Sequence, residues 1–173
     1  MTTEALVDKR IEQAVEWASN SQTSLKKAAA ATAQVGDYSG ATEQIADRCK
    51  RSLTTVYNWA NAFKLYKHER TENRAIAHHL WRELPLSFWW IAWDFHNKGY
   101  EAMPYLMNAY QHDWKTRDMR EEFRRDVEAG NAPLQFKRVK IVMRGLADDL
   151  MKFETQLTAE QLEAVQMVRK AFA

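Results

Sequence analysis

The sequence predicts an all-α protein: a multi-helix orthogonal bundle containing a helix-turn-helix, followed by a C-terminal helical hairpin or dimerisation helix. Only 5 glycines and 3 prolines interrupt the 173 residues, which leaves little room for loops. Apolar residues recur at spacings of three and four, and no long run alternates with the period of a strand. With 46% hydrophobic residues and 7 tryptophans, such a bundle can bury a substantial core.

Two helices are expected before the helix-turn-helix. Over residues 3–19, Val7, Ile11 and Val15 form an apolar face opposite acidic residues at four-residue spacing. The acidic row is Glu4, Asp8, Glu12 and Glu16. An alanine-rich helix over residues 24–35 follows, as a spacer or a tightly packed partner, before glycines break the chain.

Residues 42–61 predict two short helices joined by a tight turn. Ile45 and Ala46 place an apolar and a small residue where a second helix must cross closely. Val56 and Trp59, three residues apart, supply the apolar side of that second helix. This arrangement is typical of a helix-turn-helix, although it also occurs in helical hairpins with a purely structural role.

Nine polar or basic residues in the turn and on the outward face of the second helix are candidates for DNA contact. They are Lys50, Arg51, Ser52, Thr54, Thr55, Tyr57, Asn58, Asn61 and Lys64. Ser52 can also cap the second helix. Asn58 and Asn61 carry amides that suit bidentate contact with adenine, and the basic side chains suit phosphate.

The charge distribution supports a local DNA-binding surface better than the total charge does. The net charge of +2 is nearly neutral and decides little about partners. From Arg48 to Lys67, however, there are five basic residues, Arg48, Lys50, Arg51, Lys64 and Lys67, and no acid among them. A basic patch on a protein of mixed charge is the expected footprint of site-specific DNA binding.

The middle of the chain predicts an aromatic core. A helix is expected over residues 73–83; Pro85 then interrupts, and Ser87 can cap a helix with apolar residues on nearly every side. A buried core is favoured over an exposed tryptophan patch that stacks single-stranded bases. Pro104 opens a further helix, and residues 118–129 form one with a solvated face of mixed charge.

A boundary at residues 130–133 separates a DNA-binding domain over residues 1–129 from a C-terminal helical pair over residues 134–173. Seven apolar residues beyond it alternate in spacings of three and four, as in a heptad seam. They are Phe136, Val139, Met143, Leu146, Leu150, Phe153 and Leu157. Thr158 and Gln161 predict a capping box at the start of the last helix.

The seam either pairs with its copy in a second subunit or folds against the last helix. We favour a homodimer, because one helix-turn-helix alone contacts too little DNA for tight specific binding. Gly145 inside the seam counts against a long regular coiled coil.

No enzymatic chemistry, cofactor or metal site is expected from the sequence. A single cysteine, Cys49, excludes a disulfide framework, and no glycine-rich phosphate loop is present. His79 and Glu83 share a helix face but show no third ligand. Without a signal peptide, and with an apolar run over residues 84–93 too short for a bilayer, we expect a cytoplasmic, nucleoid-associated protein without a small-molecule substrate.

Two short motifs beyond the helix-turn-helix carry a resemblance to a known family. Leu86-Ser87-Phe88 stands where one helix is expected to open, and the segment from Trp114 to Arg120, WKTRDMR, where another does. In this order the chain resembles the central DNA-binding domain of the ParB/KorB partition proteins over residues 42–128. That family has a Leu-Ser motif at the first place and Trp-Ser-x-Arg-acid-Leu-Arg at the second, where Lys115 here replaces the serine.

The resemblance implies a DNA-binding module in which Ser52, Thr54, Thr55, Tyr57 and Asn58 sit where the family contacts its site. No Gly-Glu-Arg-Arg-like segment precedes the motif, so the family's CTP-dependent clamp is not implied. We therefore expect a sequence-specific binder of double-stranded DNA, a transcriptional regulator or partition-type protein of phage or plasmid character. The alternatives are a phage assembly protein, such as a small-terminase-like ring subunit, and a protein-binding adaptor.

Overall fold

The computed structural model describes residues 3–18, 21–36 and 38–171, without the side chains of residues 136–142 and 171. Over this part of the chain it contains ten α-helices, one 3-10 helix and no strand, so the expected all-α multi-helix bundle is confirmed. The helices are α1 (Thr3–Trp17), α2 (Gln22–Val35), α3 (Ala41–Cys49), α4 (Leu53–Glu72), α5 (Arg74–Glu83), α6 (Leu86–Asn97), α7 (Met103–Gln111), α8 (Thr116–Glu128), α9 (Phe136–Met151) and α10 (Ala159–Ala171).

The chain divides into two compact units. The larger one comprises residues 1–98 and 102–132, and the smaller one residues 99–101 and 133–173. A single β-bridge between Tyr100 and Leu134 joins the two segments of the smaller unit. Of the expected first helix, Ser19 lies outside the described residues, as does Asp37 in the break before α3.

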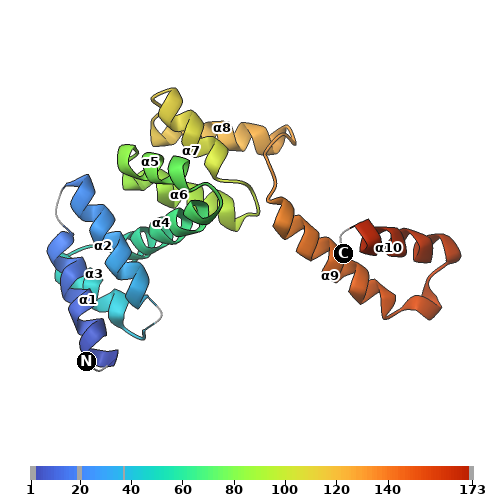
Figure 1. The fold of residues 1–173 in the computed structure, drawn as a ribbon, viewed down its shortest axis with the longest axis horizontal. Helices are drawn as coiled ribbons and strands as arrows, with labels where there is room; N and C mark the ends of the chain where they lie inside the picture. Colours follow the sequence, from blue (N-terminus) through green and yellow to red (C-terminus); the bar gives the residue numbers. More distant parts are fainter. Residues whose placement is uncertain (1–2, 19–20, 37, 172–173) are drawn as a thin grey trace. The chain divides into compact units, whose positions relative to one another are not determined.

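The alanine-rich helix α2 is tightly packed, with α1 on one side and α4 on the other (Figure 1). Ala28, Ala29 and Ala31 are buried, and the hydroxyl of the buried Thr32 donates to the carbonyl of Ala28 at 2.8 Å. Methyl side chains allow neighbouring helices to approach closely. Of the two interpretations of this helix, the tightly packed partner is therefore confirmed and the spacer is wrong.

The helix α4 is long enough to contact two groups of helices in the larger unit. Its first turns contact α2 and α3, and its later turns contact α5 and α6 (Figure 1). In the later part Tyr66 stacks on Trp81 with ring centroids 4.5 Å apart, and Trp81 meets the edge of Trp89 at 5.2 Å. These three rings are buried, so the predicted aromatic core is confirmed.

The two other tryptophans of α6 are only half-buried. The guanidinium of Arg120 lies over the ring of Trp90, with Cζ 5.1 Å from the ring centroid. The ring of Trp93 stacks on that of His96, with centroids 5.6 Å apart. The mixed-charge face of α8 is solvated as predicted, with exposed ion pairs such as Arg117–Glu121 and Arg124–Glu128, both at 3.6 Å.

The N-terminal part of α2 ties together the corner between α5 and α6. The Lys26 ammonium donates to the carbonyl of Arg82, in the last turn of α5, at 2.9 Å. The Leu86 N–H, at the start of α6, donates to Gln22 Oε1 at 3.2 Å. Ser87 was expected to cap α6, and this is wrong: Pro85 holds the N-cap position, Ser87 lies inside the helix, and the free N–H finds its acceptor on α2.

In the smaller unit α9 and α10 pack against each other as a helical hairpin. Ala147 on α9 and Val165 on α10 are buried there. The predicted capping box is confirmed: the Thr158 N–H donates to Gln161 Oε1 at 2.9 Å, and the Gln161 N–H donates to Thr158 Oγ1 at 3.3 Å.

The expected continuous heptad seam is wrong. The helix α9 ends at Met151, so Phe153 and Leu157 lie beyond it. Two aspartates, Asp148 and Asp149, place negative charge at the negative end of the helix dipole, which weakens continuation. The capping box also requires a fresh helix start after Leu157. The side chains of Phe136 and Val139 lie outside the described residues.

Candidate nucleic-acid interface

The three residues 50–52 turn the chain sharply between α3 and α4. Lys50 adopts a left-handed conformation with φ 53°, and the Arg51 N–H donates to the carbonyl of Ala46 at 3.0 Å. This arrangement satisfies one of the last free carbonyls of α3. The conformation is one that glycine adopts without strain, and here a lysine adopts it.

Ser52 caps α4 as predicted. Its hydroxyl oxygen accepts the N–H of Thr55 at 3.2 Å, and the two hydroxyls lie 2.8 Å apart within hydrogen-bond distance. Both side chains therefore help to fix the start of α4, which limits the hydroxyl capacity left for other contacts.

The inner side of the helical pair is firmly packed. Ile45 and Ala46 on α3, and Val56 and Trp59 on α4, are all buried. Closely packed side chains at a helix crossing fix the angle between the helices, because a change of angle would open cavities between them. The outward side of α4 is consequently held in one orientation.

A polar stripe runs along the outward side of α4. Thr54, Tyr57, Asn61 and Lys64 follow one another at spacings of three and four, so they lie on one helix face. Thr54, Tyr57 and Lys64 are exposed, Tyr57 by 44%, and Asn61 is half-buried. The stripe is about 15 Å long, a length that fits a major groove.

The remaining candidate residues surround this stripe. Lys50, Arg51 and Ser52 are exposed in the turn, and Thr55 and Asn58 are half-buried on the flank of α4. Within the larger unit, as far as its residues are described, none of the nine candidates is buried. Leu53 was not among them, yet its side chain is exposed at the first position of α4, where an apolar group can meet a thymine methyl.

Farther along α4, exposed residues continue on the same face, with His68 four residues after Lys64. Other side chains of this part are covered: Ala62 and Leu65 are fully buried, and α6 packs on α4.

The basic residues around the turn are all solvent-exposed. They are Arg48, Lys50, Arg51, Lys64 and Lys67. Beside them Cys49 is half-buried, and burial raises the pKa of its thiol although Arg48 and Arg51 act in the opposite direction. The thiol is thereby kept in its protonated form, in which a cysteine behaves as a small apolar side chain.

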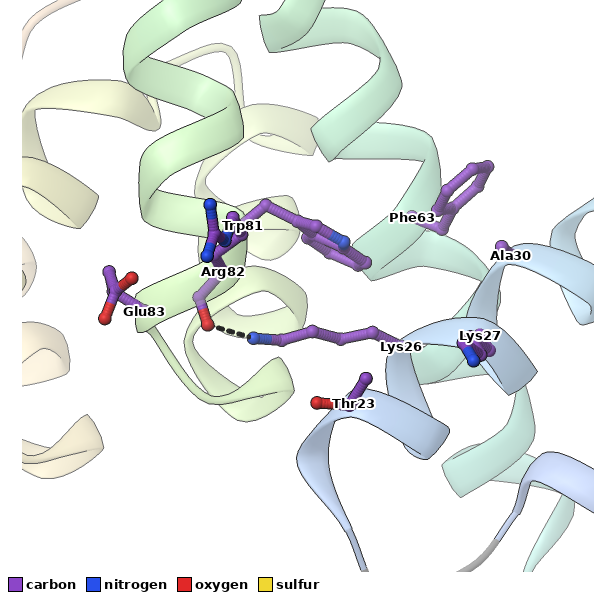
Figure 2. Close-up of a pocket in the computed structure, with 8 residues that line it drawn as sticks. All are labelled: Thr23, Lys26, Lys27, Ala30, Phe63, Trp81, Arg82 and Glu83. Carbon is purple, nitrogen blue, oxygen red and sulfur yellow. Dashed lines mark hydrogen bonds between the residues drawn. The ribbon is translucent and has the colours of Figure 1, made fainter.

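A separate cavity of about 580 Å³ lies between α2, α4 and α5. Figure 2 shows Lys26 reaching across it to the main-chain carbonyl of Arg82, with Trp81 alongside. Burial lowers the pKa of Lys26, and the nearby Glu83 opposes that shift. Because the Lys26 ammonium is engaged at the end of α5, we assign this cavity to the packing of the corner and not to the interface.

The described residues also contain a cluster that the sequence pattern does not indicate. His68 and Glu69 on α4 and His96 on α6 bring their potential ligand atoms within 4.8 Å of one another. The sequence pairs His79 with Glu83 along one helix, whereas the fold joins residues from two different helices.

In the described ranges, no helix combines the length and apolarity needed to cross a bilayer.

No protein-family model, curated protein or solved structure matches this chain.

Proposed function

We propose that this protein binds double-stranded DNA sequence-specifically, as a transcriptional regulator or partition-type protein. In this proposal α3 and α4 act as a helix-turn-helix, and the first turns of α4 enter the major groove. The observation that carries the proposal is the polar stripe on α4, accessible on its outward side and anchored by Val56 and Trp59 on its inner side.

The candidate residues on the stripe and around it have distinct roles in this arrangement. Asn58 and Asn61 offer amides for base edges, with adenine as the base that matches a bidentate amide. Thr54 and Tyr57 offer hydroxyls for phosphate oxygens, and Thr54 also has a methyl for thymine. Lys50, Arg51 and Lys64 supply positive charge toward the DNA backbone.

The order of helices also supports a ParB-like module. Leu86 and Ser87 open α6, and the segment from Trp114 to Arg120 leads into α8 through the cap at Lys115. At that cap the Lys115 N–H donates to Asp118 Oδ2 at 2.9 Å. These are the two places at which the family's motifs begin their helices.

We further propose that the protein acts as a homodimer through its C-terminal unit. Leu146, Leu150 and Phe153 are exposed on α9 and directly after it, at spacings of four and three, while α10 packs on the side of Ala147. An exposed apolar row on one subunit is self-complementary in a two-fold dimer. Two DNA-binding units would then read two half-sites.

Selection of bound fragments from random duplex DNA, followed by titrations, tests the proposal. On the selected site, Asn58→Ala should weaken binding by about 1–3 kcal/mol and should leave random DNA nearly unaffected. Arg51→Ala should weaken both alike and lower the salt slope by about 1. Two matched controls lie elsewhere on the larger unit: Asn108→Ala on α7 and Arg124→Ala on α8, both exposed, should change neither.

Equal loss on selected and random DNA for Asn58→Ala would remove this residue from base reading. Affinity for duplex DNA that does not depend on salt, or no affinity at all, would refute the proposed function and favour a protein-binding adaptor. A large closed ring in a mass measurement would favour an assembly subunit.

A further inference from the structure

We propose that His68, Glu69 and His96 form a binding site for a transition-metal ion of the Zn²⁺ type, which links α4 to α6. This site lies beyond the proposed DNA-binding stripe on α4, with His68 four residues after Lys64, and the inference does not depend on the proposed function. It joins the later part of α4 to the last turn of α6.

The three side chains meet because α4 and α6 pack against each other. The imidazole rings of His68 and His96 have centroids 4.7 Å apart, and all three potential ligand atoms lie within 4.8 Å of one another. Around a tetrahedral Zn²⁺ with bonds of 2.0–2.2 Å, ligand atoms would lie roughly 3.3 Å apart. Side-chain rotations of His68 and Glu69 toward His96 would supply that contraction.

The chemistry of the donors selects the class of ion. Two imidazole nitrogens and one carboxylate oxygen suit Zn²⁺, Co²⁺ and Ni²⁺. Ca²⁺ and Mg²⁺ prefer sites made of oxygen atoms alone, so they are poor matches. Three protein ligands leave at least one coordination position for water or another small ligand.

The three side chains differ in exposure. Glu69 is only 8% exposed, so its carboxylate would hold an ion on the inner side of the cluster. His68 is exposed, which gives an ion in solution access to the cluster.

The ring of His96 is already oriented. It stacks on Trp93 with centroids 5.6 Å apart and an angle of 18° between the planes. Neighbours that fix the orientation of a ligand ring increase metal affinity, because less freedom is lost when the ion binds.

Titration of the full chain with Zn²⁺ by calorimetry, after removal of any affinity tag and of metal with a chelator, tests the proposal. One equivalent should bind and raise the melting temperature. His68→Ala and His96→Ala should each weaken binding at least tenfold. His79→Ala is the matched control, because this exposed histidine lies on α5 outside the cluster, and it should bind like the wild type.

Co²⁺ provides a second readout that does not depend on stability. The wild type and His79→Ala should give visible d–d absorption of a bound ion, and His68→Ala should lose it while its circular dichroism is unchanged. Because His68 is exposed, this variant is expected to fold. The proposal would be overturned if the wild type bound no ion, or if His68→Ala and His96→Ala bound the ion as tightly as the wild type.

Discussion

Lys50 shows how a single residue can carry a structural cost at a place where its charge is useful. Its φ of 53° is unfavourable for a residue with a Cβ and costs roughly 1–2 kcal/mol. Its ammonium lies exposed in the turn between α3 and α4, where the proposed function needs positive charge. Replacement of this residue by glycine should therefore lower DNA affinity without lowering stability.

We predict that Lys50→Gly leaves the free energy of unfolding unchanged or raises it by up to about 1 kcal/mol, since relief of strain outweighs the freer unfolded chain. Lys50→Val should lower it by more than about 1 kcal/mol, because a branched Cβ suits this conformation least. Both variants should lose DNA affinity. Urea denaturation gives the stability order, and titration with duplex DNA gives the affinity.

Arg51→Gly serves as the control for this pair, because in the described residues Arg51 is not among the non-glycine residues with positive φ. It should bring no gain in stability. If Lys50→Gly were clearly less stable than the wild type, strain at this position would not be significant.

At the same scale, the residues with local partners were the ones that the sequence predicted well. Ser52, and Thr158 with Gln161, cap helices through atoms three residues away, so their motifs contain all the information required. The burial of Val56 and Trp59 likewise follows from helical spacing. The cluster of His68, Glu69 and His96 could not be predicted, because it depends on how α6 lies against α4.

Among the elements, α6 depends on a cap that comes from a distant part of the chain. Pro85 precedes the helix and offers no side-chain acceptor, and the Leu86 N–H bonds to Gln22 on α2 instead. Among the residues near the start of this helix, Ser87 is the expected cap because its hydroxyl can accept a hydrogen bond. Long-range caps escape such reasoning, since they require the packing of α2 to be known.

We predict that Gln22→Ala lowers the free energy of unfolding by about 1 kcal/mol, because the Leu86 N–H loses its acceptor. Thermal or urea unfolding of the full chain measures the loss. Gln34→Ala is the matched control on the same helix, since Gln34 is exposed, and it should be neutral within about 0.5 kcal/mol. Equal stability of the two variants would show that the bond to Gln22 contributes nothing.

The C-terminal helices show why a spacing pattern alone did not determine an element. Residues at spacings of three and four share a helix face, but the pattern does not say what covers that face. In the structure Ala147 faces α10, while Leu146 and Leu150 remain exposed, and the helix stops at Met151. The hairpin that the sequence left open as an alternative is the arrangement that forms within one chain.

For the whole molecule, we predict that the exposed apolar row of the smaller unit holds two copies together. Sedimentation equilibrium should give a dimer for the wild type and a monomer for the double variant Leu146→Lys/Phe153→Lys, because burying lysines opposes association. These side chains are 54% and 53% exposed, so the change should not unfold the chain. The double variant should also bind a DNA with two half-sites more weakly than the wild type, because dimerisation is lost.

Glu163→Lys is the control for added positive charge, since Glu163 is exposed on α10, and this variant should remain dimeric. A wild type that sediments as a monomer at every concentration would contradict the prediction.

The length of α4 has a consequence for how any partner meets the protein. This helix of 20 residues is about 30 Å long, and its far half is seated in the aromatic cluster around Tyr66 and Trp81. The half that bears the stripe is therefore held rigidly, because it continues a helix whose other half is packed in the core. A ligand that fits it would meet a ready-made surface, and association should require little ordering of the chain and proceed without a slow conformational step.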